Sequence, residues 1–321
     1  MSGATSSTIS NLVKPEVIEK VSTVVFRNSE FIPLFRFDYS PASVLGINVN
    51  IAGNSSVGSY VEGQADPDPG YQQVVQASVP WKYFKVMTRI TGHAKDNLGL
   101  TWENVYSNSS SAPNAYGGQF LEPELAAQDL VDYMNTYFMA AQTYGIQGIV
   151  DDDTTAFYNL SRSTYTALKS YVKSSAGALS LSLMDRLLQN VREQGGRVEA
   201  ILISPTQGRK YDGLVEGKIA LPSAGDAAGG AGAGFHQPHN RVPVIEARDL
   251  TETTMIALSG LSGSDDSSSW RFVSHCPHPS RVEWQAVSFG NDAATAQLTT
   301  SGALVCPIPA FQGKLEGLGT T

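Results

Sequence analysis

Apolar residues recur at helical spacing over one long stretch, from Glu122 to Gly145. Acidic residues lie near its start, where they suit the helix dipole, and Pro123 fits the first turn. Gly145 fits the position just past the end. The pattern predicts a helix of roughly 30 to 35 Å. Its apolar stripe consists of Leu130, Met134, Tyr137, Phe138, Ala141 and Tyr144.

Alternating apolar and polar residues predict a hairpin ahead of this helix. Residues 44–53 alternate strictly, which is typical of a half-buried strand. The following stretch, Gly53–Tyr71, is rich in Gly, Ser, Asp and Pro and predicts a loop. A second run, from Gln72 to about Thr91, predicts the returning strand. A connecting loop of this length is usually functional or folds against a partner.

The second half of the chain predicts an α/β region followed by closing strands. Ser180–Gln194 is amphipathic and stops at two glycines, which predicts a helix. Val198–Ile203 predicts a buried strand, and Ser204 with Pro205 predicts the start of another helix. The low-complexity stretch 217–240 predicts a loop. Further strand-like runs lie at 242–250, 254–260, 270–276, 281–290 and 303–311.

Composition adds an expectation about surfaces. The chain has 321 residues, enough for two linked subdomains, and is 41% hydrophobic. Its charged fraction of 16% is low beside the usual value of about 25%, so neighbouring copies are expected to cover much of the surface. A net charge of −8 argues against a nucleic-acid-binding surface but is compatible with enclosing DNA. No signal peptide or membrane-spanning run is present, which predicts a soluble protein.

Candidate chemistry is sparse. No nucleophile motif occurs, and the glycines at 229–234 lack the Lys-Ser/Thr pair of a phosphate-binding loop. The triplet Asp151–Asp153 is interpreted as a solvated turn rather than a cation site, and His93 as a structural residue. Zinc ligand types gather in HQPH and HCPH, but the prolines within them and the absence of CxxC favour no metal. The residues concerned are His236, His239, His275, Cys276 and His278.

Two smaller features, the cysteines and a basic group, are interpreted as structural. Cys276 and Cys306 are expected to be buried small hydrophobes rather than a disulfide. A basic group interleaved with aromatic residues at 81–95 would suit single-stranded nucleic acid, but a charged strand edge that meets acidic neighbours is favoured. This group contains Lys82, Lys85, Arg89 and Lys95, with Trp81, Tyr83 and Phe84. The sequence thus predicts no enzyme and no cofactor.

The order of parts resembles the major capsid protein of tailed bacteriophages, which has the Hong Kong 97 fold. FRNSEFIPLFRF resembles the N-terminal arm, and VLGINVNIAG with VPWKYFKVMTRITGHAKDN resembles the extended hairpin loop. LEPELAAQDLVDYMNTYFMAAQTYGI resembles the spine helix. LMDRLLQNVREQGGRVEAILISPTQGRKYDGL resembles the axial domain, and ALVCPIPAFQGKL the final strand of the peripheral domain. The resemblance covers nearly the whole chain.

The resemblance implies an α+β chain divided as in that family. The expected parts are the arm (1–40), the extended hairpin loop (41–95), a peripheral domain with the spine helix (96–150), the axial domain (151–265) and closing peripheral strands (266–321). It also implies hexamers and pentamers in an icosahedral shell around double-stranded DNA, with a portal protein. The virion head would be its location, after assembly in the host cytoplasm.

Two departures from the family refine these expectations. Only about a dozen Ser/Thr-rich residues precede the arm, which implies a separate scaffolding protein. The tip at Gly53–Tyr71 has no lysine, so covalent cross-linking is not expected and a decoration protein is an option. Candidate subunit contacts are Phe31, Phe35, Phe37, Tyr60, Glu62, Tyr71, Trp81, Lys82, Lys85 and Arg89. The alternatives are an encapsulin-like compartment of the same fold and a metal-dependent enzyme using the four histidines above.

Overall fold

The computed structural model combines helices with sheets, which confirms the predicted α+β class. It forms two compact units. The first contains the described parts of Lys82–Met134 and Ser274–Gly302; the second contains those of Ser29–Trp81, Asn135–Val273 and Ala303–Thr321. The structure describes residues 34–42, 45–54, 56–57, 70–91, 122–139, 144–153, 156–216, 235–261, 269–274, 284–290, 293–306 and 308–320.

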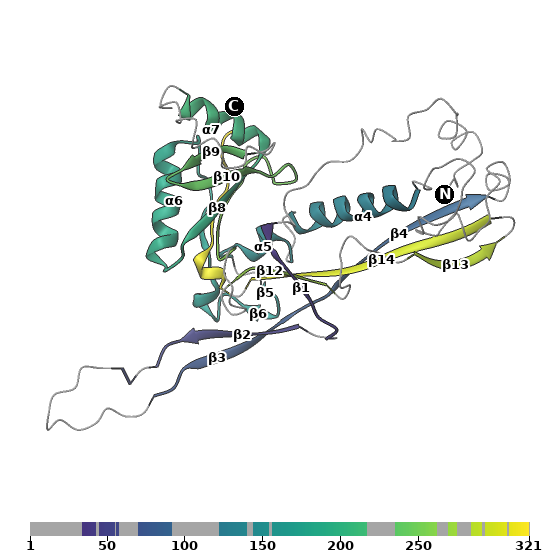
Figure 1. The fold of residues 1–321 in the computed structure, drawn as a ribbon. Helices are drawn as coiled ribbons and strands as arrows, with labels where there is room; N and C mark the ends of the chain where they lie inside the picture. The colour runs from purple at the N-terminus through teal and green to yellow at the C-terminus, as the bar shows by residue number, and fades with distance from the viewer. Residues whose placement is uncertain are drawn as a thin grey trace. The chain divides into compact units, whose positions relative to one another are not determined.

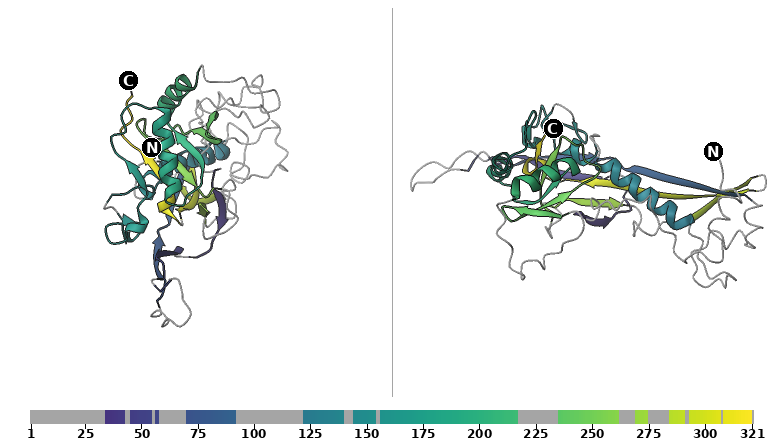
Figure 2. Two further views of the ribbon diagram at one scale, coloured as in Figure 1. Left: turned by 90° about the vertical axis from the view of Figure 1, so that its left-hand side faces the viewer. Right: turned by 90° about the horizontal axis from the view of Figure 1, so that it is seen from above.

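The first unit is a sheet with a helix along it. The long strand β14 (Ala293–Val305) pairs antiparallel with β4 (Lys82–Thr91) and with β13 (Trp284–Gly290). The helix α4 (Glu122–Met139) runs beside β4 and β14 (Figures 1 and 2). The ring of Phe84 on β4 lies 6.1 Å from that of Tyr133 on α4, so Phe84 faces the helix.

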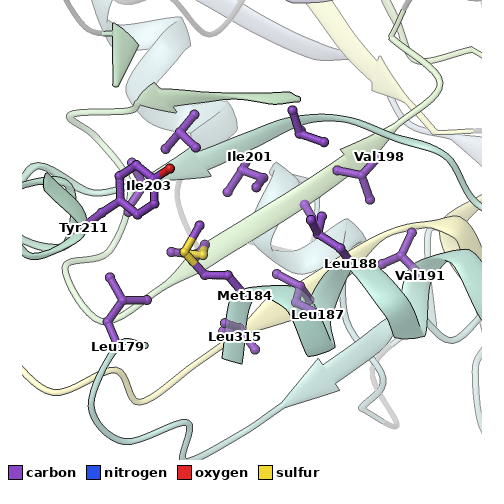
Figure 3. Packing of buried hydrophobic residues seen from close by; sticks show 14 of the residues in the cluster. Leu179, Met184, Leu187, Leu188, Val191, Val198, Ile201, Ile203, Tyr211 and Leu315 are labelled. Atoms are coloured by element: carbon purple, nitrogen blue, oxygen red, sulfur yellow. The ribbon is translucent and has the colours of Figure 1, made fainter. Parts of the chain in front are cut away.

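The second unit is built on a six-stranded sheet in the order β7-β15-β11-β8-β10-β9. The alternation of β8 divides its side chains between two buried faces. Ile201 and Ile203 belong to the cluster beneath the helices α6 and α7, and Ala200 and Leu202 are buried on the opposite face (Figure 3). The elements are β7 (Tyr171–Lys173), β8 (Val198–Ile203), β9 (Phe235–His239), β10 (Val242–Glu246), β11 (Met255–Ser259), β15 (Gly313–Leu315), α6 (Leu181–Glu193) and α7 (Pro205–Val215).

Smaller elements complete the second unit. A two-stranded hairpin joins β2 (Leu45–Ala52) to β3 (Gln73–Val79), and β1 (Arg36–Tyr39) neighbours β12 (Arg271–Ser274), which pairs with the end of β14. The rest are α5 (Ile146–Ile149), β5 (Ala156–Phe157), β6 (Leu160–Ser161), η2 (Thr166–Leu168) and η4 (Pro309–Phe311). Among the described residues, no helix is long and apolar enough to cross a membrane.

Several predicted elements are confirmed by their local chemistry. The Ser180 hydroxyl accepts a hydrogen bond from the Leu183 amide and caps α6. Gly195, just beyond that helix, has a φ of 95°, the left-handed conformation that ends a helix cheaply with glycine. The strand Val198–Ile203 lies where predicted, and Ser204 caps α7 with Pro205 in its first turn.

Two predicted features are wrong in detail. The run expected to form one hairpin strand through Thr91 is two strands: β3 ends at Val79, before Pro80, and β4 pairs with β14 instead of β2. Proline has no N–H for a strand ladder, which explains the break. The described part of the long helix is Glu122–Met139, and Gly145, which was expected just past its end, instead precedes the short helix α5 with extended backbone.

One more correction concerns the end of a predicted segment. The stretch 217–240 was expected to be a loop, yet Phe235–His239 forms β9, whose edge position tolerates Pro238. Residues 217–234 lie outside the described residues. The strand Gly313–Leu315 pairs with β7 and β11 and so belongs to the six-stranded sheet.

Candidate subunit interface

The β2–β3 hairpin has a buried face and an exposed face. Ile47 and Val49 of β2, and Ala77 and Val79 of β3, are buried, and the residues between them are more accessible. At its base the Ser78 amide donates to Asn159 Oδ1 at 2.7 Å, and β2 packs against η2. Figure 1 shows both strands running out from the region of β5 and β6. Among the described residues, the hairpin is therefore held near its base.

Large apolar side chains are exposed toward the tip of this hairpin. Val57 is 84% exposed, Tyr71 75% and Val74 55%. An isolated two-stranded hairpin is marginally stable in water. Grouped exposed apolar residues commonly mark contact sites with other proteins. These residues are therefore candidates for contact with another subunit.

The strand β4 carries a second candidate surface. Phe84 is buried on the helix side, whereas Tyr83 is 73% and Met87 49% exposed on the alternate positions. Lys85 lies between them and is also exposed. A nucleic-acid platform needs several accessible rings. Only Tyr83 among the three aromatic residues is strongly exposed, since the Trp81 indole is half-buried and donates to the Ala42 carbonyl at 3.1 Å.

The other predicted contact residues lie in different environments. The Phe35 ring packs 5.5 Å from Trp270, and the Phe37 ring lies 6.3 Å from Phe272, so both contact their own chain. Lys82 is half-buried, and Arg89 is opposite Thr295 in the β4–β14 ladder. A subunit role for all these residues stays a prediction. Phe31, Tyr60 and Glu62 lie outside the described residues.

The histidines do not form a metal site in the described part of the chain. His239 is buried, and its Nε2 lies 2.9 Å from Asp185 Oδ1, so the carboxylate already occupies that nitrogen. His236 is opposite Val244 in the β9–β10 pair. No group of three His, Cys, Asp or Glu side chains gathers among the described residues. The predicted cluster at His275, Cys276 and His278 and the predicted structural residue His93 lie outside them.

A buried set of cations holds the short helix α5, which sequence analysis did not identify. The Arg162 guanidinium donates to the carbonyls of Gly148 and Ile149 at 3.0 and 2.6 Å. The Lys314 ammonium donates to the Gln147 carbonyl at 3.0 Å and lies 3.2 Å from Asp151. Burial lowers the pKa of Arg162, and the charge of Asp151 opposes that effect. Asp151 is therefore half-buried and paired with the buried Lys314, whereas Asp152 and Asp153 are exposed, as expected of a turn.

Tyr158 and Cys306 form a second buried pair that had no local sequence pattern. The Tyr158 hydroxyl donates to the Leu304 carbonyl at 2.8 Å and accepts from the Cys306 amide at 3.1 Å. Burial raises the pKa of the Cys306 thiol well above its usual range, so the thiol is unreactive. The prediction that this cysteine is a buried small residue is confirmed. Cys276 lies outside the described residues.

Comparison with known proteins gives matches in structure but not in sequence. No family model and no curated protein sequence matches the chain. The capsid asymmetric unit of cyanophage A-1(L) is 15% identical, with a TM-score of 0.68 over 96% of this chain and 98% of that chain. The holo-SrpI encapsulin complex of Synechococcus elongatus PCC 7942 is 9% identical, with a TM-score of 0.64 over 100% and 98%. The capsid of a native GTA particle is 12% identical, with a TM-score of 0.62 over 96% of each chain.

These likenesses extend over nearly the whole chain. The chain therefore has the Hong Kong 97-like capsid fold, as its resemblance implied. Identities of 9 to 15% establish the fold alone. The domain boundaries implied by the resemblance stay predictions.

Proposed function

We propose that this chain is a major capsid protein, which assembles as hexamers and pentamers into an icosahedral shell around the double-stranded DNA of a tailed phage. The observation that carries the proposal is the likeness to a cyanophage capsid subunit over 96% of the chain, at a TM-score of 0.68. The shell would form in the host cytoplasm and become the virion head. The chain would act as a structural protein, without enzyme activity.

The two exposed surfaces support this role. Tyr71 and Val74 near the hairpin tip would lose their apolar exposure against a neighbouring subunit. The β4 surface, with Tyr83 and Lys85, offers a basic partner for acidic groups. The hairpin loop of a neighbouring subunit could supply these acidic groups, because Gly53–Tyr71 contains three carboxylates and no lysine or arginine. Charge complementarity of this kind fixes the register of an interface more than it adds affinity.

The wider assembly follows from the same proposal. A separate scaffolding protein would guide assembly, a portal would occupy one vertex, and a decoration protein is an option for the outer surface. The net charge of −8 suits DNA that is enclosed without being gripped. Residues 225–234 lie outside the described residues; the family resemblance alone suggests that they fall near the capsomer axis, in which case shortening 227–234 should disturb capsomer closure.

An encapsulin-like compartment is the second candidate, because the encapsulin likeness has a TM-score of 0.64 and covers 100% of the chain. The two candidates share a fold and differ in contents, which are DNA in one case and cargo protein in the other. The histidine-based metalloenzyme has no support among the described residues, where Asp185 already contacts His239 Nε2.

The test is electron microscopy of the purified protein, expressed alone and with a candidate scaffolding protein, beside size-exclusion chromatography. Closed shells or rings of five and six are expected, and nuclease-protected DNA in shells made during infection would separate a capsid from a compartment. A clean monomer or dimer in every preparation would discard the shell function.

A charge reversal tests the β4 surface within the same experiment. Lys85→Glu should raise the protein concentration needed for assembly by about tenfold or more, since like charges across an interface cost several kcal/mol. Arg197→Glu makes the same charge change at another exposed position and is the matched control. Equal assembly of Lys85→Glu and wild type would remove β4 from the proposed interface.

A further inference from the structure

The strand β15 occupies an interior place in the six-stranded sheet. It lies between β7 and β11, pairing in parallel with the first and antiparallel with the second. Among the described strands, β15 is the only neighbour of β7 in this sheet. We call residues 156–177, which comprise β5, β6, η2 and β7, the platform. The platform therefore joins the sheet through β15.

Hydrogen bonds on the platform side continue beyond the strand ladder. The Ser170 hydroxyl donates to the Pro309 carbonyl at 2.7 Å, and the Tyr171 amide to the Gln312 carbonyl at 3.1 Å. Further along, the Ala176 amide donates to the Glu316 carbonyl at 2.8 Å. Residues 309–319 thus follow the platform from η2 to its end.

The same residues are fixed to the rest of the sheet by side chains. Gln312 is 2% exposed; its Oε1 accepts from the Ser259 amide at 2.8 Å and its Nε2 donates to the Ser259 carbonyl at 3.1 Å. Gln207 of α7 donates to the Gly319 carbonyl at 2.9 Å. Leu315 and Leu318 are 0% and 1% exposed in the core cluster. Residues 309–319 therefore contact both the platform and the rest of the six-stranded sheet.

The hairpin rests on this platform. The Ser78 amide at the hairpin base donates to Asn159 in the turn between β5 and β6. The strand β2 packs against η2, and η2 in turn packs against η4, which begins at Pro309. A continuous set of contacts thus leads from residues 309–319 through the platform to the hairpin base.

We propose that residues 309–319 are a clasp that controls the placement of the β2–β3 hairpin. With the clasp closed, the platform and the hairpin base are fixed to the six-stranded sheet, and the exposed tip is presented in one orientation. With the clasp open, the hairpin gains conformational freedom, which an interface must then remove at an entropic cost. Assembly therefore selects the closed state. This part of the inference rests on the proposed shell function.

Hydrogen exchange measured by mass spectrometry on the unassembled full chain tests the clasp. Ser170→Ala removes the bond to Pro309, and Gln312→Ala removes the bonds to Ser259. We expect amide exchange in β2 and β3 to accelerate roughly fivefold for Ser170→Ala and more for Gln312→Ala, with β10 unchanged. Ser180→Ala is the matched control, because it removes the α6 cap in the same unit without touching the clasp.

The outcomes separate the clasp from general stability and from the shell function. Faster exchange confined to residues 309–319, with the hairpin unaffected, would overturn the proposal. Equal acceleration of the hairpin by Ser180→Ala would overturn it too, because the cause would then be lower overall stability. Ser170→Ala keeps the test usable if Gln312→Ala does not fold. A wild type that forms no shells would refute the shell function, while the exchange data would still decide on the clasp.

Discussion

Replacing Tyr158 with phenylalanine removes one oxygen that serves two buried backbone groups. The hydroxyl bridges the Leu304 carbonyl and the Cys306 amide, where the chain leaves β14. Tyr158 is 5% exposed, and its ring lies 4.4 Å from that of Phe157, a contact that phenylalanine keeps. The substitution therefore isolates the hydrogen bonds from the packing.

The magnitude follows from the groups left behind. An unsatisfied buried donor or acceptor costs about 1–3 kcal/mol, and here two such groups lose their partner. Leu304 also pairs with Phe272 in the β12–β14 ladder. The loss of the Tyr158 hydroxyl is therefore expected to cost less at the Leu304 carbonyl than at the Cys306 amide. We therefore expect Tyr158→Phe to lower the free energy of unfolding by about 2–4 kcal/mol.

The assay is urea unfolding of the unassembled chain, followed by circular dichroism and by tryptophan fluorescence. Because the chain has two units, the transition that contains buried Trp270 is the relevant one. Tyr71→Phe, at a 75% exposed tyrosine, is the control and should change stability by less than about 0.5 kcal/mol. An equal effect of the two substitutions would refute the bridging role of Tyr158.

Two further predictions concern the second unit. Burial, and secondarily the charge of Asp212, raises the pKa of Tyr211 to about 12, above the unfolded value of about 10. The stabilising contribution of the protonated Tyr211 is therefore present below pH 10 and is lost as the pH rises toward 12. The Tyr211→Phe variant should accordingly show a smaller fall in urea midpoint between these pH values than the wild type. An equal fall in both proteins would contradict this prediction. An added Cβ at Gly313 would lie 2.7 Å from Val191 Cγ2 and 2.8 Å from Leu187 Cδ1. Gly313→Ala should therefore cost about 1–3 kcal/mol by urea unfolding, whereas Gly213→Ala, with no atom within 4 Å of the added Cβ, should not destabilise; equal effects would show that the core adjusts.

Elements whose signals are local could be predicted from the sequence. The serine cap and the stop at Gly195 define α6, and the buried run Val198–Ile203 followed by Ser204 and Pro205 defines the next strand and helix. Each of these depends on residues within a few positions of one another. Hydrogen-bond caps and backbone preferences act at that range.

Strand partners could not be predicted in the same way. The alternation of Gln73–Val79 and of Lys82–Thr91 predicts strands equally well, yet β3 pairs with β2 and β4 pairs with β14. Strand preference mainly reflects packing on neighbours, which a single segment does not specify. The three residues Gly313–Leu315 are shorter than any useful periodic window, and they join the sheet through partners distant in sequence.

The candidate site also combines features that have a local sequence signal with features that depend on residues distant in sequence. The half-buried strand β2 could be predicted, because its apolar and polar residues alternate strictly. The place where the hairpin rests could not, because Asn159 lies in a short turn and acts through one side-chain oxygen. The role of Lys314 could not be predicted either. Its neighbours Gly313 and Leu315 face the helix side of the sheet, so strand alternation directs the Lys314 ammonium to the opposite side, where it reaches α5. A buried cation of this kind requires its partners in place, so Lys314 fixes residues 309–319 to the region of α5.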